Sequence, residues 1–120
     1  MNRLTDSEWK VLEVLWAGGG QPLGQIMEAL EPGTGWSRTT VHTYLTRMMA
    51  KGLVRTEGQS PRHYFAALTR EECADRQRRE LVDRVYQGSA GKLVAAFVKD
   101  GSLSTEEREQ LRRLLDEMEV

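Results

Sequence analysis

The chain has 120 residues, of which 29% are charged and 39% hydrophobic, and its formal net charge is −1. This length suits one ordinary domain or two very small ones, and the composition is typical of a soluble globular protein. The longest uncharged apolar stretch, Leu93 to Val98, is far too short to cross a bilayer, so no insertion into a membrane is expected. The start of the chain lacks the apolar core of a signal peptide. A single cysteine, Cys73, excludes an internal disulfide and fits a reducing cytosol, which predicts a cytoplasmic protein.

The first thirty residues predict two helices. Thr5 and Glu8 have the spacing of a capping box, so a helix is expected to begin there and to end at Gly18-Gly19-Gly20. A second helix is predicted from about Pro22 to Leu30, because proline suits the first turn of a helix. The segment 32–35, which contains one proline and two glycines, is expected to form a loop.

A third helix is predicted between Ser37, a suitable N-cap, and Gly52, a natural C-terminal stop. Its apolar residues recur at helical spacing and form one face: Val41, Tyr44, Leu45, Met48 and Met49. The opposite face has no acidic residue and carries Arg38, Thr39, His42, Thr43, Thr46 and Arg47. Threonine can contact a thymine methyl or a phosphate, and arginine can bond guanine through two atoms. A merely solvated face would favour Glu, Lys and Gln over Thr, so the pattern indicates a recognition helix in a major groove.

A β-hairpin is predicted next, with strands over 53–57 and 62–67 joined by a turn that contains Gly58 and Pro61. Three helices followed by a two-stranded ribbon predict a winged helix-turn-helix. The expected fold class is therefore mainly α with a small two-stranded β wing, followed by a C-terminal helical dimerisation region.

The last third of the chain predicts three more helices, over about 69–87, around 93–98 and from Ser104 onward. These helices carry few large apolar groups, and so small a unit has difficulty holding a core alone. We therefore expect domain 1–68 to bind DNA and domain 69–120 to form a homodimer. The residues expected to make the dimer contacts are Leu81, Val82, Val85, Tyr86, Leu93, Val94, Phe97, Leu111, Leu114 and Leu115.

Charge is distributed unevenly along the chain. Residues 36–68 contain five cations and one anion, whereas residues 69–120 contain ten cations and twelve anions. Local positive charge is what meets phosphates, so the near-neutral total does not exclude a nucleic-acid partner. An excess of four positive charges over residues 36–68 is nevertheless modest, which suggests that two copies bind double-stranded DNA together. Their half-sites are expected to lie about 34–36 Å apart or a multiple of that distance.

The predicted DNA contacts fall into two groups. Residues expected to read or flank bases are Arg38, Thr39, His42, Thr43 and Thr46. Residues expected to hold the phosphate backbone are Thr40, Arg47, Lys51 and Arg62, and the predicted interface also includes Ser37, Arg55 and His63. For the wing residues the alternative is that they are ordinary exposed strand positions.

The sequence offers no pattern typical of an enzyme or a metal site. His42, His63 and Cys73 match no zinc or copper spacing, and no nucleophile–base set or glycine-rich phosphate loop is present, so no cofactor is expected. Cys73 near a helix start is either an inert buried thiol or an oxidant sensor. The three tryptophans are expected to belong to the core, with a ligand pocket as the alternative.

These residues resemble the penicillinase-repressor family over nearly the whole chain. The resemblance is carried by Glu8, Val11 and Leu15-Trp16, by Thr39-Thr40-Val41-x-Thr43-x-Leu45-x-Arg47, by Lys51-Gly52-Leu53-Val54, by Tyr64, and by Leu68-Thr69-Arg70-Glu71-Glu72. Gly88-Ser89, Leu93-Val94, Phe97 and Leu103-Ser104-x-Glu106-Glu107 are similar to the family's dimerisation region.

The resemblance implies a dimeric bacterial transcriptional repressor that binds operator dyads. It also implies a target such as a β-lactamase or antibiotic-resistance gene, and a membrane sensor protease as a further partner. In the family, DNA is released when the C-terminal region is cut, at a bond that corresponds here to Ala96–Phe97. Two other functions remain open: a ligand-responsive winged-helix regulator, and a winged-helix protein-interaction module that does not bind DNA.

Overall fold

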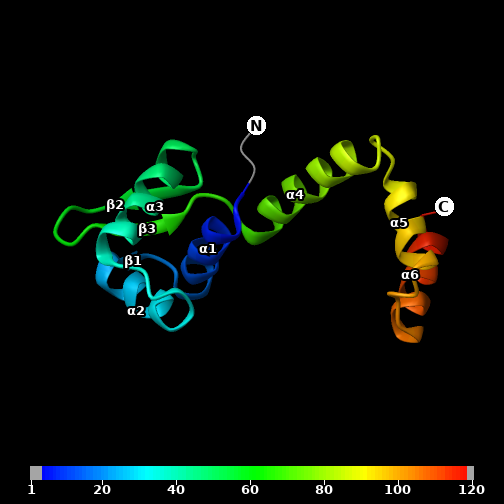
Figure 1. Cartoon of the computed structure of the whole chain (residues 1–120), viewed down its shortest axis with the longest axis horizontal. Coiled ribbons are helices and arrows are strands. Elements are labelled where there is room, and N and C mark those ends of the chain that lie inside the picture. The colour runs from blue at the N-terminus through cyan, green and yellow to red at the C-terminus, as the bar shows by residue number, and fades with distance from the viewer. Residues whose placement is uncertain (1–3, 119–120) are drawn as a thin grey trace. The chain divides into compact units, whose positions relative to one another are not determined.

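The computed structural model describes residues 4–118, which contain six helices and a three-stranded antiparallel sheet (Figure 1). The chain divides into two compact units, residues 1–77 and 78–120, and each is described by itself. The elements in chain order are α1 (Asp6–Gly18), β1 (Gln21–Pro22), α2 (Leu23–Thr34), α3 (Arg38–Ala50), β2 (Val54–Glu57), β3 (His63–Ala66), α4 (Arg70–Val85), α5 (Ala90–Lys99) and α6 (Thr105–Glu117).

Helix α1 begins with the predicted capping box. The Thr5 hydroxyl accepts the Glu8 backbone N–H at 3.1 Å, and the Glu8 carboxylate accepts the Thr5 N–H at 3.0 Å. The helix ends in the glycine run, where the Gly19 N–H donates to the Leu15 carbonyl. The cap therefore fixes where the helix starts, and its buried residues Val11, Leu12 and Leu15 face the core.

Helix α2 starts and ends later than the sequence pattern predicts. Pro22 takes an extended conformation as the N-cap, and the helix continues through Pro32 to Thr34. The predicted loop over 32–34 is thus wrong. A proline in the last turn removes only one helical hydrogen bond. The end is closed by the left-handed Gly35, whose N–H donates to Glu31, and by the Thr34 hydroxyl, which donates to Leu30.

Helix α3 has both predicted ends. The Ser37 hydroxyl accepts the Thr40 N–H at 3.2 Å. Gly52 follows the helix with φ 77°, and the N–H of Leu53 donates to the Met48 carbonyl at 2.9 Å. Glycine suits this position because it has no Cβ and adopts a positive φ without strain. The predicted inner face is confirmed, since Val41, Leu45 and Met48 are fully buried.

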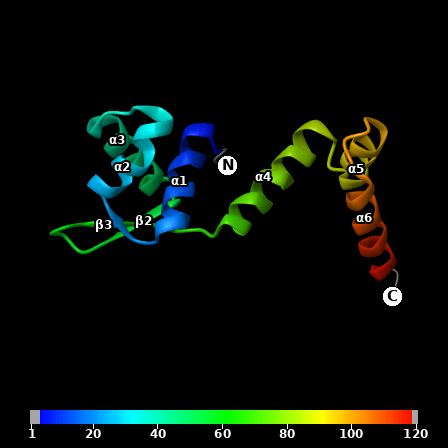
Figure 2. The ribbon, with the colours of Figure 1, turned by 90° about the horizontal axis from the view of Figure 1, so that it is seen from below.

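The predicted hairpin is present as β2 and β3, and a third strand joins it. The sheet order is β1-β3-β2. Tyr64 of the central strand β3 lies opposite Gln21 of β1 on one side and opposite Thr56 of β2 on the other. The expected two-stranded ribbon is therefore part of a three-stranded sheet. The hairpin, which we call the wing (residues 54–66), reaches out beyond α1, α2 and α3 (Figures 1 and 2).

One glycine allows the sheet to approach the end of α1. A Cβ built on Gly20 would lie 2.2 Å from the Phe65 Cζ, so no larger residue fits without moving that ring. The buried Gln21 side chain donates to the carbonyls of Val14 and Gly19 and holds β1 in place. These contacts explain why a strand of only two residues is stable.

A single core fills the N-terminal unit. Its buried members are Val11, Leu12, Leu15, Ile26, Leu30, Val41, Leu45, Met48, Leu53, Val54, Tyr64 and Cys73. The three tryptophans are half-buried and pack at the edge of this core, rather than inside it. Trp36 stacks on Tyr44 with ring centres 4.8 Å apart, and Trp9 meets Trp16 edge-on at 5.2 Å.

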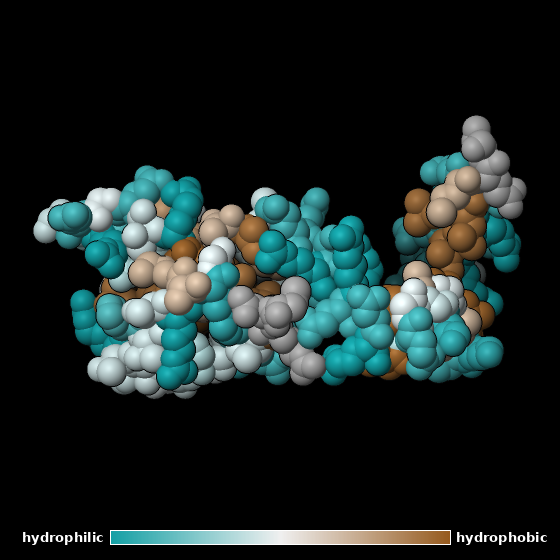
Figure 3. Space-filling model, turned by 90° about the horizontal axis from the view of Figure 1, so that it is seen from above, coloured by the Kyte–Doolittle hydropathy of each residue, from teal (hydrophilic) through white to brown (hydrophobic). Residues whose placement is uncertain are grey.

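The C-terminal unit contains amphipathic helices, and none of its described residues, 78–118, is fully buried. Helix α4 ends at Val85, two residues before the predicted Gln87, which has a positive φ of 49°. Capping by Ser89 opens α5, and a Ser104–Glu107 capping box opens α6. Figure 3 shows hydrophobic side chains gathered on the surface of α5 and α6. The large exposed hydrophobic residues are Val85, Val94, Phe97, Val98, Leu114, Leu115 and Met118.

Within residues 4–118, no helix is both long enough and apolar enough to cross a membrane. The prediction about a signal peptide concerns the first residues, of which 1–3 lie outside the described part. The predicted domain boundary at 68/69 stays a prediction, and the boundary between the two compact units falls at Gln77, inside α4.

Candidate nucleic-acid interface

The outer face of α3 is exposed and free of acidic residues, as the sequence predicts. Arg38, Thr39, His42, Thr46 and Arg47 are exposed, and Thr40 and Thr43 are half-buried on the flanks of the same face. Because Val41, Leu45 and Met48 anchor the opposite face in the core, the orientation of the polar face is fixed. A rigid helix with such a face matches the size of a major groove.

Hydrogen bonds within α3 decide which polar atoms remain available. The Thr43 hydroxyl donates to the Thr39 carbonyl at 2.9 Å, so its hydrogen is already used. The Ser37 hydroxyl donates to the Thr40 hydroxyl while it caps the helix. Thr43 can therefore offer a methyl group and oxygen lone pairs to a partner, whereas Ser37 and Thr40 are largely occupied with the start of the helix.

An open groove of about 690 Å³ joins α3 to the wing and to the start of α2. It brings the predicted residues Arg38, Thr39 and His42 of α3 together with Arg62 of the wing. The other residues that line it are Pro22, Leu23, Gly24, Gln59, Pro61 and Tyr64. None of the lining residues is acidic, and two are arginines, so the groove suits an anionic ligand.

A smaller hollow of about 200 Å³ lies farther along the same helix. It is lined by Thr39, Thr40, Thr43, Tyr44 and Arg47. The polar face thus has one hollow on the side of the wing and one on the side of Tyr44, with Thr39 shared by both.

The cations of the wing differ in their surroundings. Arg55 forms an ion pair with Glu57, and its guanidinium carbon lies 4.3 Å from the centre of the Phe65 ring. Arg62 is exposed and lines the groove. The His63 Nδ1 lies 3.2 Å from the Pro61 carbonyl oxygen, within hydrogen-bond distance in one tautomer. Arg62 is therefore the wing cation best placed for a ligand in the groove.

Lys51 is held away from the groove by an ion pair that the sequence did not reveal. Its Nζ lies 2.6 Å from the Glu8 Oε2, and the Glu8 side chain is only 5% exposed. Burial by itself raises the pKa of Glu8, but the hydrogen bonds from Lys51 and Thr5 and the charge of Lys51 outweigh it and hold the pKa below its usual range. Lys51 therefore balances a buried carboxylate and ties the end of α3 to α1.

The structure also places the other predicted site residues. Of the predicted dimer contacts, Val85, Val94, Phe97, Leu114 and Leu115 are exposed. Leu81, Val82, Tyr86, Leu93 and Leu111 are half-buried. The Ala96–Phe97 bond lies inside α5, with Ala96 half-buried and Phe97 46% exposed.

Cys73 is not a surface thiol. It is 1% exposed and belongs to the core of the N-terminal unit, and burial raises its pKa. A raised pKa keeps the thiol protonated and unreactive. Among residues 4–118 no group of three His, Cys, Asp or Glu side chains gathers in a way that suits a metal ion.

The groove includes residues that the sequence reasoning missed. Pro22, Leu23 and Gly24 line it because β1 pairs with β3 and so brings the start of α2 beside the wing. The only sequence signal for their position was the helix-turn-helix pattern, in which the first residues of the second helix lie beside the recognition helix.

The family model of the penicillinase repressor matches residues 4–117. The methicillin resistance regulatory protein MecI of Mammaliicoccus sciuri is 26% identical over 114 residues, which cover 94% of this chain and 93% of MecI. The penicillinase repressor of Bacillus licheniformis is 23% identical over 116 residues, which cover 96% of this chain and 91% of that protein.

Solved structures show the same fold. The monomeric form of Bacillus licheniformis BlaI, solved in complex with the blaP half-operator, matches with a TM-score of 0.53 and 21% identity, over 59% of this chain and 88% of that chain. Bordetella bronchiseptica BpsR matches with a TM-score of 0.50 and 22% identity, over 98% of this chain and 76% of that chain. Since the family model spans nearly the whole sequence, the chain belongs to the penicillinase repressor family, a family of winged-helix transcriptional repressors.

Proposed function

We propose that this protein is a homodimeric repressor that binds operator DNA in the cytoplasm, with α3 in the major groove and the wing on the adjacent backbone. The strongest support is the acid-free groove that joins Arg38, Thr39 and His42 to Arg62. Phosphates carry negative charge along the whole duplex, so a surface with arginines and without carboxylates favours a close approach to it. Membership of the family, and the half-operator in the BlaI complex, support the same ligand.

The roles of the contact residues follow from their surroundings. Arg38, Thr39, His42, Thr43 and Thr46 project from the outer face of α3 and are proposed to meet base edges or the flanking backbone. Arg47 and Arg62 lie at the two sides of this face and are proposed to hold phosphates. Lys51 and Arg55 already have carboxylate partners, so we assign them to the structure of the domain instead.

Homodimerisation is proposed through the C-terminal unit. Seven large apolar side chains between Val85 and Met118 are exposed, which is unusual for helices that work as a single copy in water. A second copy of the same helices would cover them. Sedimentation equilibrium should then give twice the chain mass of 13.7 kDa. A particle of 13.7 kDa at micromolar concentration would contradict a dimer.

DNA binding is tested by a salt titration of Arg62→Ala against a random duplex. Each phosphate contact contributes about 0.9 to the slope of log K against log salt, so the loss of one contact per protomer should lower the slope by about 1 for each protomer. The matched control is Arg112→Ala, an exposed arginine of α6. An unchanged affinity and slope for Arg62→Ala would remove the wing from the interface.

Base reading is tested with Thr43→Ala. The Thr43 methyl is proposed to contact a base, so the substitution should cost on the order of 1 kcal/mol on the cognate site and much less on random DNA. Equal losses of affinity on the cognate and the random duplex would contradict a base-reading role for Thr43.

Release by proteolysis at Ala96–Phe97 is a further part of the proposal, and it rests on the family resemblance. The bond lies within the helical hydrogen bonds of α5, so a protease must first unwind this helix locally. Cleavage would separate Phe97, Leu114 and Leu115 from the DNA-binding unit. A purified chain cut at this bond should elute as a monomer from a sizing column and lose its preference for a dyad over a half-site. A cut chain that stayed dimeric and kept its preference for the dyad would contradict release by this cleavage.

A further inference from the structure

The flank of α3 away from the wing carries a stripe of side chains that can donate hydrogen bonds. Thr40, Tyr44 and Arg47 follow one another at intervals of four and three residues, so they lie on one side of the helix. Together with Thr39 and Thr43 they line the hollow of about 200 Å³. The spacing of apolar residues put Tyr44 on the inner face of α3, but the structure leaves it half-buried. Tyr44 therefore lies at the border between the core and the polar face.

The ring of Tyr44 is held in place by its neighbour in the loop before α3. Trp36 stacks on it with ring centres 4.8 Å apart and an angle of 29° between the planes. The Trp36 backbone N–H donates to the Thr34 hydroxyl at 3.2 Å, and that hydroxyl donates to the Leu30 carbonyl at 2.8 Å. The loop is thus tied to the end of α2, and the stacked indole limits the rotation of the Tyr44 ring.

Two donors at this hollow have no acceptor within the described part of the chain. The Tyr44 hydroxyl has no hydrogen-bond partner among residues 4–118 and is not one of their buried unpaired polar atoms, so it reaches the surface. Arg47 is exposed and forms no ion pair with another of these residues. None of the residues that line the hollow is acidic. A phenol O–H beside a guanidinium suits an acceptor that carries negative charge.

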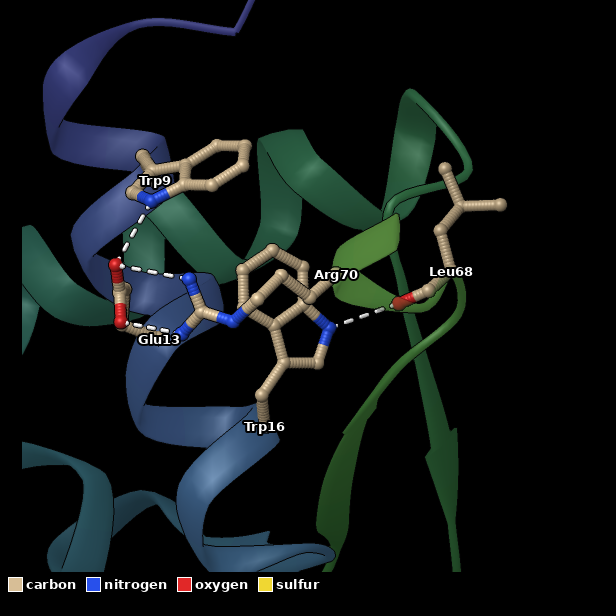
Figure 4. Close-up of polar contacts among 5 residues, drawn as sticks. All are labelled: Trp9, Glu13, Trp16, Leu68 and Arg70. Carbon is tan, nitrogen blue, oxygen red and sulfur yellow. Dashed lines mark hydrogen bonds and ion pairs between the residues drawn. The ribbon is translucent and has the colours of Figure 1, made fainter. Parts of the chain in front are cut away.

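A second cluster of aromatic rings and an arginine, beside α1, shows the opposite case (Figure 4). The Trp9 indole N–H donates to the Glu13 Oε1 at 2.8 Å, and the Arg70 Nη2 donates to the Glu13 Oε2 at 2.6 Å. The Trp16 indole N–H donates to the Leu68 carbonyl at 2.9 Å. Each of these three groups has an acceptor inside the protein. The two donors beside α3 have none there, so their acceptor is expected to come from a ligand.

We propose that Tyr44 is a further DNA-contact residue, whose hydroxyl binds one phosphodiester of the DNA backbone together with Arg47, while Trp36 positions its ring. This inference rests on the proposed function, because it requires α3 in a major groove. A helix with its side chains is about 10–12 Å across, and the groove is about 12 Å wide. Both flanks of α3 therefore come close to a phosphate backbone. Arg62 of the wing serves one flank, and the hollow at Tyr44 serves the other.

Tyr44→Phe tests the contact because it removes the hydroxyl and keeps the stacked ring. Full-length protein is titrated with a random duplex at several salt concentrations. The affinity should fall about tenfold, since a hydrogen bond to a charged group is lost. The salt slope should not change, because the phenol is neutral, whereas Arg47→Ala should lower the slope by about 1 for each protomer. An unchanged affinity of Tyr44→Phe would overturn the contact and leave the proposed function intact. Absence of binding by the wild type would overturn both.

Neutral linkages in the DNA locate the acceptor. The wild type selects a binding site from a random duplex pool, and each phosphodiester of that site is replaced in turn by an uncharged methylphosphonate. At one linkage Tyr44→Phe should bind within about twofold of the wild type, because the partner of the hydroxyl is already altered. The loss caused by Arg62→Ala should disappear at a different linkage. An equal loss for Tyr44→Phe at every linkage would mean that the hydroxyl acts only through the fold, and would overturn the contact.

The positioning role of Trp36 is tested with Trp36→Leu on the unmodified duplex and on the duplex with that one neutral linkage. The ratio of the two affinities does not depend on the fraction of folded protein. It should be smaller for Trp36→Leu than for the wild type, as it is for Tyr44→Phe. Trp9→Leu removes another half-buried tryptophan, which lines neither hollow, and should keep the wild-type ratio. A wild-type ratio for Trp36→Leu, or a reduced one for Trp9→Leu, would contradict positioning of Tyr44 by the stack.

Discussion

The ion pair between Glu8 and Lys51 predicts that Glu8→Gln destabilises the protein, although the substitution keeps the size of the side chain. Glu8 is 4% exposed, and its carboxylate accepts the Thr5 N–H at 3.0 Å and the Lys51 ammonium at 2.6 Å. Glutamine can keep the bond from Thr5 through its carbonyl oxygen, but its neutral amide cannot balance Lys51.

The size of the effect follows from the burial of each partner. Breaking a fully buried pair costs about 3–5 kcal/mol. The Lys51 side chain is 32% exposed and can turn to water, which lowers the expected loss for Glu8→Gln to about 2 kcal/mol. Glu28→Gln, which makes the same change on the exposed face of α2, should change the free energy of unfolding by less than about 0.5 kcal/mol.

The same pair predicts a pH dependence. The pKa of Glu8 is lower in the folded protein than its ordinary value, so the folded state binds this proton less readily than the unfolded state. The stabilisation of the folded protein by the Glu8 carboxylate is therefore present above the pKa of Glu8 in the unfolded chain. It is lost as the pH falls through the pKa of Glu8 in the folded protein. Urea denaturation from pH 7 down to pH 3 should show the difference between wild type and Glu8→Gln shrinking at the acidic end. A difference below about 0.5 kcal/mol at pH 7, or one that grows on acidification, would contradict a stabilising ion pair between Glu8 and Lys51.

Three further predictions concern other parts of the domain. Lys51→Met keeps the aliphatic stem but leaves the charge of the Glu8 carboxylate unbalanced, so it should lower the free energy of unfolding by about 2 kcal/mol. The salt slope of DNA binding should not change, and a slope reduced as in Arg62→Ala would mean that Lys51 contacts a phosphate. Cys73 should react with a thiol reagent only when the protein unfolds, and fast labelling in native buffer would contradict its burial. Cys73→Ser should lower the free energy of unfolding by about 1–3 kcal/mol in a thermal or urea melt, because it buries a hydroxyl. Gly20→Ala should cost about 1–3 kcal/mol in the same melt, since its Cβ would meet the Phe65 ring, and a neutral result would mean that the ring moves freely.

Local signals in the sequence predicted the helix starts well. The capping box at Thr5 and the N-cap at Ser37 are both present, because each needs only residues three positions apart. The spacing of the apolar residues likewise gave the correct buried face of α3. The polar face of that helix was therefore predictable before any tertiary contact was known.

Features that depend on distant partners were not predictable. Strand β1 has two residues, and it exists only because Gln21 and Pro22 pair with β3. Cys73 lies in a run of charged residues, and nothing local shows that its side chain enters the core of another segment. Lys51 looked like a free cation because its partner, Glu8, lies 43 positions earlier. The site residues stay a prediction, and the structure shows that two of the predicted cations, Lys51 and Arg55, already have carboxylate partners.

DNA binding by the outer face of α3 is tested most directly by heteronuclear NMR of the labelled protein, which maps the backbone amides that respond to a short random duplex at low salt. We expect the largest shift changes on residues 38–47 of α3, on the wing around Arg62, and on the start of α2 at Leu23 and Gly24. An absence of changes at saturating duplex, or changes centred on the outer surfaces of α5 and α6, would contradict DNA binding by the acid-free face of α3.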